Sequence, residues 1–503
     1  MNDNAKRRIK KIIIVGGGTA GWMTAAAFSK VLGTSCYDIV LIESDDIGTV
    51  GVGEATIPLI TSFNQILGLD ESQFMKKTQA TFKLGIEFVN WGNIGDRYIH
   101  PFGVYGKGIG SLAFYNFLLK QQKIKPDTDV GDYSINIQAA RHNKFMRAPN
   151  LPNSPLADIR YAYHFDAGLY ALYLRNYAEQ QGAIRVQGEI TNVSLDDDSG
   201  CITSVTLKDG QTHSADFFID CSGFRGLLIE QALKTGYEDW SHLLLSDTAI
   251  TVPSEVIHPL PSFTRSTAHS AGWQWCIPLQ HRTGNGHVFS SRFMSEDEAT
   301  SLLLQHLPTP ALAGPRTVKF KTGIRRKLWN KNCVAIGLSS GFIEPLESTS
   351  IHLIHSAIHK LLTFFPTGAL SQVDIDKYND VMRTDIEFIR DFILLHYKAT
   401  SRTDSAFWNH CRTMDVPDGL RKKMELYIKS GRLYRDNNEL FTEDSWFAVM
   451  EGQGVKVEDY HPLVDSVEQV KFDAMLGDIA RAIRESTDVI PSHAEYIARY
   501  CKA

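Results

Sequence analysis

The sequence predicts a mixed α/β fold built on a parallel sheet, with long insertions and a helical C-terminal part. The first observation is a β-branched run at residues 11–15 that leads directly into a glycine-rich turn and then a helical stretch. The second is that similar apolar runs recur at residues 216–223 and 334–338. The third is a change to helical, aromatic sequence from about residue 366.

The glycine-rich turn is a GxGxxG motif placed between a predicted strand and a predicted helix. Such glycines permit a tight turn and let the backbone approach a pyrophosphate at the helix N-terminus. A second strand at residues 39–42 ends in an acidic residue, 22 positions beyond the last glycine of the motif, where it could bond a ribose hydroxyl. The expected dinucleotide contacts are Gly16, Gly18, Thr19, Ala20, Gly21 and Glu43.

The dinucleotide is predicted to be FAD. A nicotinamide dehydrogenase usually keeps a compact series of strands and helices after this unit, whereas here a glycine-rich loop follows at residues 47–58 and the later strands are far apart. We therefore expect a Rossmann-like FAD-binding domain of the flavin-monooxygenase type over residues 1–365. Insertions at about 90–150 and 232–320 would form the substrate chamber, and the helical region 366–503 would cap it.

Composition excludes several classes of protein. The chain has 503 residues, 22% of them charged, and a net charge of −5, which argues against general nucleic-acid binding. No apolar stretch approaches the roughly 20 residues of a membrane helix. The seven cysteines are scattered singly, as in a protein of a reducing cytoplasm, and indicate no structural zinc site. We expect a cytoplasmic protein.

A predicted strand–loop–helix corner at residues 341–353 is suited to binding an anion. Ser348 and Thr349 stand where helix N-caps belong, with Glu347 beside them. The free N–H groups and the positive end of the helix together attract a small anion. Considered alone, the corner could equally be an ordinary capped helix.

A lysine lies within a predicted strand at residues 82–88. Alternation places Lys83 and Gly85 on one face and apolar side chains on the other. A glycine beside the lysine leaves room for another group to approach. The alternative is a solvated lysine on the outer face of a half-buried strand.

Taken together, these motifs resemble the flavin-dependent halogenases of the tryptophan-halogenase type, and the similarity covers nearly the whole chain. The matching segments are the GxGxxG turn, Gly53-Glu54-Ala55-Thr56, Lys83 in Phe82-Lys83-Leu84-Gly85-Ile86, Trp273-Gln274-Trp275-Cys276-Ile277-Pro278 and Pro345-Leu346-Glu347-Ser348-Thr349. The resemblance implies that reduced FAD, O2 and chloride or bromide give hypohalous acid, with a separate NAD(P)H-dependent reductase supplying the reduced flavin.

The resemblance also implies roles for individual residues. Lys83 would hold the hypohalous acid or carry the halogen as a haloamine, and Glu347 would pair with Lys83 and take the ring proton. Trp273 and Trp275 would form a wall beside the flavin. The backbone amides of Thr349 and Ser350 would bind the halide. Further flavin contacts are expected at Val50, Glu54, Ala55, Leu338 and Ile351.

The expected substrate is an indole-type ring. His100 and Phe102 match aromatic positions that stack on indole in relatives. A Tyr-Tyr pair in relatives that act on free tryptophan aligns here with Trp446 and Phe447. Because the polar hydroxyls are lost, free indole or a simple derivative is favoured over tryptophan. Relatives commonly have glycine at Ser350, so a changed halide preference, with bromide favoured, is expected.

Two other functions remain open from the sequence. They are a flavin-dependent aromatic hydroxylase and a non-catalytic FAD-binding protein. Three histidines at 352, 355 and 359 share one side of the predicted helix, but without an HExxH motif we interpret them as its polar edge and expect no metal.

Overall fold

The first strand lies inside a six-stranded sheet, as its β-branched residues predict. The computed structural model describes residues 9–45, 53–366, 368–436 and 439–503. β1 (Lys11–Val15) pairs in parallel with β2 (Asp38–Glu43) and with β12 (Phe217–Asp220), and the strand order is β20-β21-β12-β1-β2-β8. The other strands of this sheet are β8 (Ile184–Gln187), β20 (Trp329–Asn330) and β21 (Cys333–Ala335).

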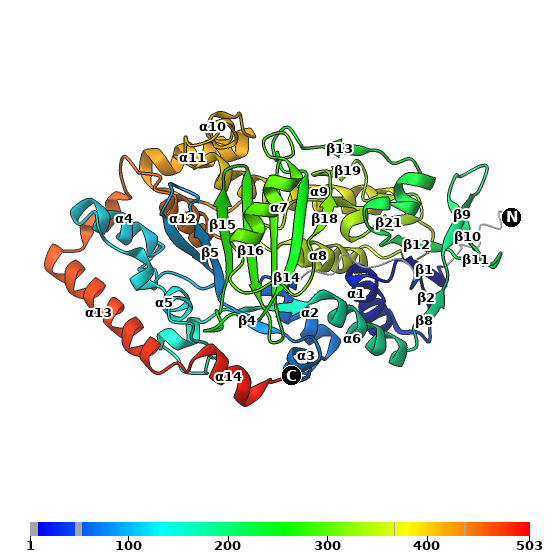
Figure 1. The fold of residues 1–503 in the computed structure, drawn as a ribbon, viewed down its shortest axis with the longest axis horizontal. Helices are drawn as coiled ribbons and strands as arrows, with labels where there is room; N and C mark the ends of the chain where they lie inside the picture. The colour runs from blue at the N-terminus through cyan, green and yellow to red at the C-terminus, as the bar shows by residue number, and fades with distance from the viewer. Residues whose placement is uncertain (1–8, 46–52, 367, 437–438) are drawn as a thin grey trace.

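A second, seven-stranded sheet occupies the middle of the molecule (Figure 1). It joins segments that are far apart in the chain, because β5 pairs in parallel with β15. Its strands, in spatial order, are β18 (Arg316–Lys319), β14 (Thr248–Ser254), β17 (Thr283–Phe289), β16 (Gly272–Pro278), β15 (Thr264–His269), β5 (Gly85–Val89) and β6 (Arg97–Pro101).

Three small sheets complete the β-structure of the described residues. One of them carries β4, whose last residue is Lys83, and so bears on the site. They contain β3 (Gly53–Ala55), β7 (Ala162–Asp166) and β4 (Thr81–Lys83); β9 (Ile190–Leu195), β10 (Ile202–Leu207) and β11 (Thr212–Ser214); and β13 (Tyr237–Asp239), β19 (Gly323–Arg325) and β22 (Gly341–Phe342).

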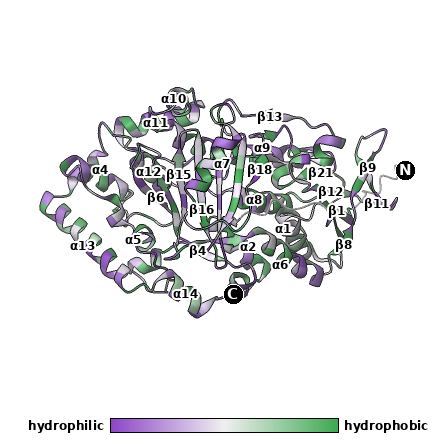
Figure 2. Ribbon diagram, viewed as in Figure 1, coloured by the Kyte–Doolittle hydropathy of each residue, from purple (hydrophilic) through white to green (hydrophobic). Residues whose placement is uncertain are grey.

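Helices surround these sheets, and α10 to α14 lie in the half of the molecule away from β1 (Figure 1). The outer helix α13 alternates hydrophilic and hydrophobic residues, as one buried face requires (Figure 2). The helices are α1 (Thr19–Phe28), α2 (Leu59–Leu67), α3 (Glu71–Lys77), α4 (Tyr115–Ile124), α5 (Ile135–Arg141), α6 (Ala167–Gln180), α7 (Glu296–Gln305), α8 (Ser350–Thr363), α9 (Gln372–Lys398), α10 (Ala406–Thr413), α11 (Asp418–Ser430), α12 (Glu443–Gly452), α13 (Gln469–Asp488) and α14 (His493–Tyr500).

The predicted single strand over residues 82–88 is wrong in one respect. The strand is interrupted at Leu84, and the two strands on either side, β4 and β5, belong to different sheets. Lys83 is fully buried rather than solvated. The group that approaches Gly85 is the backbone of β6, because a Cβ there would lie 2.4 Å from the His100 carbonyl oxygen. The chain therefore passes from one sheet to the other directly after Lys83.

The predicted α/β fold with a helical C-terminal part is confirmed. Within the described residues, no helix is both long and apolar enough to cross a membrane.

Candidate active site

A cavity of about 580 Å³ lies at the carboxyl ends of β1, β2 and β12, where an open parallel sheet binds its ligand. Gly16 has φ +110°, and a Cβ there would lie 2.3 Å from the Cys221 carbonyl oxygen. A Cβ at Gly21 would lie 1.8 Å from the Gly16 oxygen, so this glycine allows α1 to pack on the strand. A Cβ at Gly18 would meet no protein atom within 4 Å, which leaves its surface open to the cavity.

Glu43 stands at the end of β2 and lines the same cavity. Arg185 Nε donates to its Oε1 at 2.5 Å, which fixes the carboxylate. Its Oε2 lies over Gly17, at the point that a Cβ on that glycine would occupy. An acceptor held at this point suits a ribose hydroxyl.

The cavity therefore fits an FAD, with an open helix N-terminus for the pyrophosphate and an anchored acid for the ribose. Of the residues predicted to bind the cofactor, Gly21 allows α1 to pack on β1 and does not line the cavity. Val50 lies outside the described residues. The predicted cofactor residues that line the cavity are Gly16, Gly18, Thr19, Ala20, Glu43, Glu54, Ala55, Leu338 and Ile351.

Trp273 and Trp275 lie on β16 and also line the cavity. Both are buried, at 2% and 7% exposure. The Trp275 ring has room because Gly286 faces it on β17, where a Cβ would come within 2.1 Å of the indole. The pairing of a tryptophan with a glycine across two strands thus sets where the indole lies.

Lys83 is a buried lysine with neutral hydrogen-bond partners. Its Nζ donates to Ser348 Oγ at 2.7 Å and to the Thr56 carbonyl oxygen at 3.1 Å, and it lies 5.0 Å from the centre of the Phe102 ring. Burial lowers the pKa of Lys83 to about 7, against an opposing effect of Glu347. The amine can therefore change its protonation state near neutral pH.

The expected pairing of Lys83 with Glu347 is wrong as a direct contact. Among the described residues no hydrogen bond or ion pair joins the two side chains. The loop turns at Ser348, whose N–H donates to the Pro345 carbonyl oxygen and whose φ is +59°. A serine in the left-handed region costs roughly 1 kcal/mol or more, so its surroundings hold this turn.

Glu347 is instead bound by two histidines. His100 Nδ1 lies 2.9 Å from one carboxylate oxygen, and His396 Nε2 lies 2.8 Å from the other. His396 Nδ1 donates to the Phe392 carbonyl oxygen at 2.9 Å, so the contact of its Nε2 with Glu347 is favourable when the ring is an imidazolium. Burial alone would raise the pKa of Glu347, but His100 and His396 lower it to about 2.

Helix α8 begins next to this loop without a side-chain cap. Thr349 is the N-cap residue, but its hydroxyl makes no capping bond, so the expected capping by Ser348 and Thr349 is wrong. Ser348 uses its hydroxyl for Lys83 instead. The first backbone N–H bonded within the helix from the N-cap onward is that of Leu353, which leaves the amides of the first turn available to an anion. Ser350 lines the cavity.

Aromatic rings surround the side of Glu347 that faces His100. The ring of His100 lies 5.6 Å from that of Phe392 and 6.1 Å from that of Phe441. Trp446 in turn lies 5.0 Å from Phe392. Phe102 is half-buried beside Lys83. The structure thus brings His100 and Trp446 into one aromatic region, places Phe102 against Lys83, and assigns His100 a hydrogen-bonding contact that the sequence did not predict.

The two aligned residues of α12 have different surroundings. Trp446 Nε1 donates to Glu439 at 3.0 Å, and Lys423 Nζ bonds the same carboxylate at 2.6 Å. Phe447 packs against other rings, with Tyr105 at 5.2 Å. Trp446 therefore lies beside a buried ion pair, whereas Phe447 faces a hydrophobic cluster.

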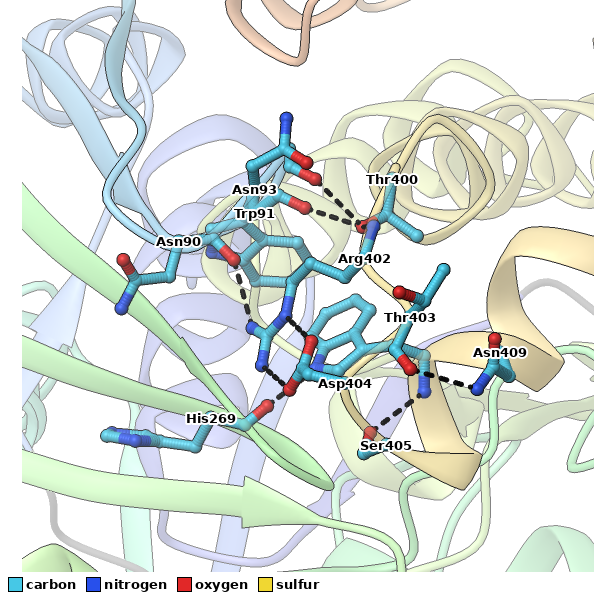
Figure 3. Close-up of polar contacts among 12 residues, drawn as sticks. Asn90, Trp91, Asn93, His269, Thr400, Arg402, Thr403, Asp404, Ser405 and Asn409 are labelled. Carbon is cyan, nitrogen blue, oxygen red and sulfur yellow. Dashed lines mark hydrogen bonds and ion pairs between the residues drawn. The ribbon is translucent and has the colours of Figure 1, made fainter.

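The segment that follows α9 is fastened to the turn after β5 (Figure 3). Arg402 forms two hydrogen bonds of 2.8 Å with the Asp404 carboxylate, donates to the Asn90 carbonyl oxygen at 2.9 Å, and lies 4.5 Å from the Trp408 ring. The arginine is only 5% exposed. We call this contact set, Arg402 with Asp404, Asn90 and Trp408, the α9 anchor, because it fixes the helix end that carries His396.

Sequence reasoning missed His396 and the role of Ser348. His396 stands in the run Phe392-Ile393-Leu394-Leu395-His396-Tyr397, 49 positions from Glu347. No spacing rule links the two positions. A polar residue within an otherwise apolar helical run was the only available signal.

Comparison with known proteins gives a consistent result. The tryptophan halogenase family model matches residues 11–469. The tryptophan 7-halogenase RebH of Lentzea aerocolonigenes is 34% identical over 532 aligned residues, covering 97% of this chain and 98% of the relative. Xcc4156, a flavin-dependent halogenase from Xanthomonas campestris, superposes with a TM-score of 0.95 at 47% identity, covering 99% of both chains. BrvH, a flavin-dependent halogenase from Brevundimonas sp. BAL3, gives a TM-score of 0.94 at 43% identity, covering 98% of this chain and 99% of BrvH.

Proposed function

The chain belongs to the tryptophan halogenase family and is a flavin-dependent halogenase, and from this premise we propose that it halogenates an indole-type ring through Lys83. The observation that carries the proposal is the buried Lys83–Ser348 contact with Glu347 next in the chain. The net reaction converts an aromatic C–H and hypohalous acid into a C–halogen bond and water. The comparisons do not favour a hydroxylase or a non-catalytic FAD-binding protein.

When bound in its reduced form, FAD would supply two electrons to O2, and O2 would take two more from the halide, which gives hypohalous acid and water. We infer that a separate reductase delivers the reduced flavin. Lys83 donates a hydrogen bond from Nζ to the hypohalous acid and polarises the O–halogen bond as the ring attacks the halogen. Because its pKa is about 7, the ammonium can also give a proton to the departing hydroxide.

Glu347 takes the proton that the ring loses. A carboxylate with a pKa near 2 is a weak base toward water, but a protonated aromatic ring is a far stronger acid than any carboxylic acid. The two histidines keep Glu347 ionised and oriented, which keeps it ready to accept the proton.

The substrate is proposed to be free indole or a simple uncharged derivative. The charged groups beside Trp446, Lys423 and Glu439, are paired with each other and only 4% and 1% exposed in their side chains. They are therefore not available to hold the ammonium and carboxylate of an amino acid, and the adjoining rings favour a flat apolar ligand.

The test is a side-by-side assay of indole and L-tryptophan. The protein is supplied with FAD, a flavin reductase, NADH, air and bromide, and products are followed by mass spectrometry for the bromine isotope pair. We expect kcat/KM to be higher for indole. A higher value for tryptophan would contradict the substrate proposal, and an oxygenated product without halogen would contradict the reaction.

We propose that bromide is used in preference to chloride. Ser350 occupies the first position of α8, so its effect comes from the side chain in the cavity beside the anion-binding amides, and not from backbone restriction. Ser350→Gly should change the ratio of bromide to chloride incorporation in competition assays. An unchanged ratio in the variant would contradict the role of Ser350, and equal use of both halides by the unaltered protein would contradict the preference for bromide.

A further inference from the structure

The loop before α8 carries a second buried acid, Glu344, which the reaction does not use. It is 0% exposed, and its Oε2 accepts hydrogen bonds from Trp273 Nε1 at 2.9 Å and from the Tyr397 hydroxyl at 2.8 Å. Neither donor is charged. Among the described residues no cationic side chain forms an ion pair with Glu344, in contrast to Glu347.

The surroundings of the other oxygen of Glu344 favour a proton on the carboxyl group. Oε1 is buried and accepts no hydrogen bond from the described residues. The neighbouring Ser246 hydroxyl interacts with this carboxyl group and with Tyr397. A neutral acid can donate its O–H to that hydroxyl, whereas an anion would be a buried charge with no cationic partner among the described residues. Burial raises the pKa of Glu344 to about 7, although Trp273, Tyr397 and Ser246 lower it.

Glu344 also connects the two sides of the reaction centre. Trp273 belongs to β16 and lines the FAD cavity. Tyr397 follows His396 on α9, and His396 binds Glu347. The last turn of α9 therefore contacts both acids of the loop. His396 contacts Glu347, and Tyr397 donates to Glu344.

We infer that Glu344 is a positioning residue that acts as a neutral carboxylic acid, holding the Trp273 wall and Tyr397 together without placing a second negative charge beside the halide. The inference rests on the proposed halogenase function. Its physical basis is that the amides at the start of α8 must bind an anion, while the same loop contains two carboxyl groups. One is neutralised by histidines and the other by its own proton.

The test compares Glu344→Gln with Glu344→Leu. Glutamine reproduces the neutral acid, because its oxygen accepts from Trp273 and Tyr397 while its amide donates to Ser246. Leucine leaves both donors unpaired in the interior. The readouts are halogenated product per FADH2 consumed, peroxide released, and KM for bromide. Tyr397→Phe, which removes a single donor, is the matched intermediate variant.

We expect Glu344→Gln to keep its coupling and its bromide KM within about twofold of the unaltered protein, and Glu344→Leu to lose about tenfold in coupling. A clearly lower bromide KM in Glu344→Gln would show that the natural carboxyl group is charged and would overturn the inference. Equal coupling in the leucine and glutamine variants, with both folded by circular dichroism, would also overturn it. The unaltered protein must halogenate in the same assay, so failure of the proposed function is seen separately.

A pH series gives a second readout. The titratable groups that face Glu344 are Tyr397 on α9 and Cys411 on α10, and burial raises the pKa of both. Both stay neutral near pH 7, so Glu344 is the group of this cluster that ionises there. The coupling of the unaltered protein relative to Glu344→Gln should therefore fall as the pH rises through about 7. A constant ratio from pH 6 to pH 8.5 would contradict the inference.

Discussion

The FAD cavity and the reaction centre are built in different ways, although Ser348 and Ser350 line the first and belong to the second. The core of the cavity comes from one continuous segment, β1 to β2, and depends on glycines and backbone groups. The reaction centre takes single side chains from β4, β6, α9 and the loop before α8.

This difference determines what a substitution does. At the cavity, a substitution acts by filling space or by straining the backbone, and its effect is confined to nearby residues. At the reaction centre the groups set one another's charge, as His100 and His396 do for Glu347, so one substitution changes the chemistry of its neighbours. The following four predictions test this contrast.

The largest effect is expected at Lys83. Lys83→Met should lower the rate of halogenation by about 10³-fold, because it removes the side chain proposed to polarise the hypohalous acid and to donate a proton. FAD binding, measured by fluorescence quenching, should remain, since Lys83 does not line the cavity. Lys83→Arg keeps the charge but cannot lose it near neutral pH, and substantial activity in this control would contradict the role.

The next effect is expected at His396. His396→Gln keeps a donor toward Glu347 but removes the imidazole, so halogenation should fall by about 10²-fold or less. The pKa of Glu347 should rise without this histidine, and the acidic limb of the pH–rate profile should move to higher pH. The exposed His359→Gln serves as the control. An acidic limb that stays in place would show that His396 does not stabilise the charge on Glu347.

The α9 anchor should show its effect in stability. Arg402→Met removes a buried guanidinium and leaves the partly exposed Asp404 to water, so the free energy of unfolding should fall by about 2 kcal/mol in urea titrations. Arg421→Met breaks ion pairs on the surface and should have a much smaller effect on the free energy of unfolding. Equal losses in the two variants would mean that the anchor contributes no more than a surface pair.

The smallest effect is expected at the cavity. Gly18→Val should weaken FAD binding by about tenfold with a smaller loss of stability than Gly21→Ala, because a Cβ at Gly18 would meet no protein atom within 4 Å. Gly21→Ala should behave in the opposite way and destabilise the fold, since its Cβ would collide with the Gly16 oxygen. Thermal unfolding of both apo-proteins, followed by FAD titration, separates the two outcomes.

Sequence patterns predicted the parts of the molecule whose residues are neighbours in the chain. β1, β2 and the GxGxxG turn are found as expected, and so is the strand that carries Trp273 and Trp275. Among the strand predictions, the single strand through residues 82–88 failed because Leu84 and Gly85 meet β6 and the chain changes sheets there. Alternation describes one strand and contains no information on which partner strand it meets.

The sequence by itself determined the α/β fold and the nucleotide-binding turn, because local periodicity and glycine placement are properties of adjacent residues, whereas the roles proposed for Lys83 and Glu347 come from the resemblance to the halogenase family. Only the tertiary structure decided the charge of those side chains. In the fold, Glu347 contacts His100 and His396, Lys83 donates to Ser348, and Glu344 accepts from two uncharged donors. The protonation of a buried group depends on desolvation and on its nearest partners, and folding brings those partners from distant parts of the chain.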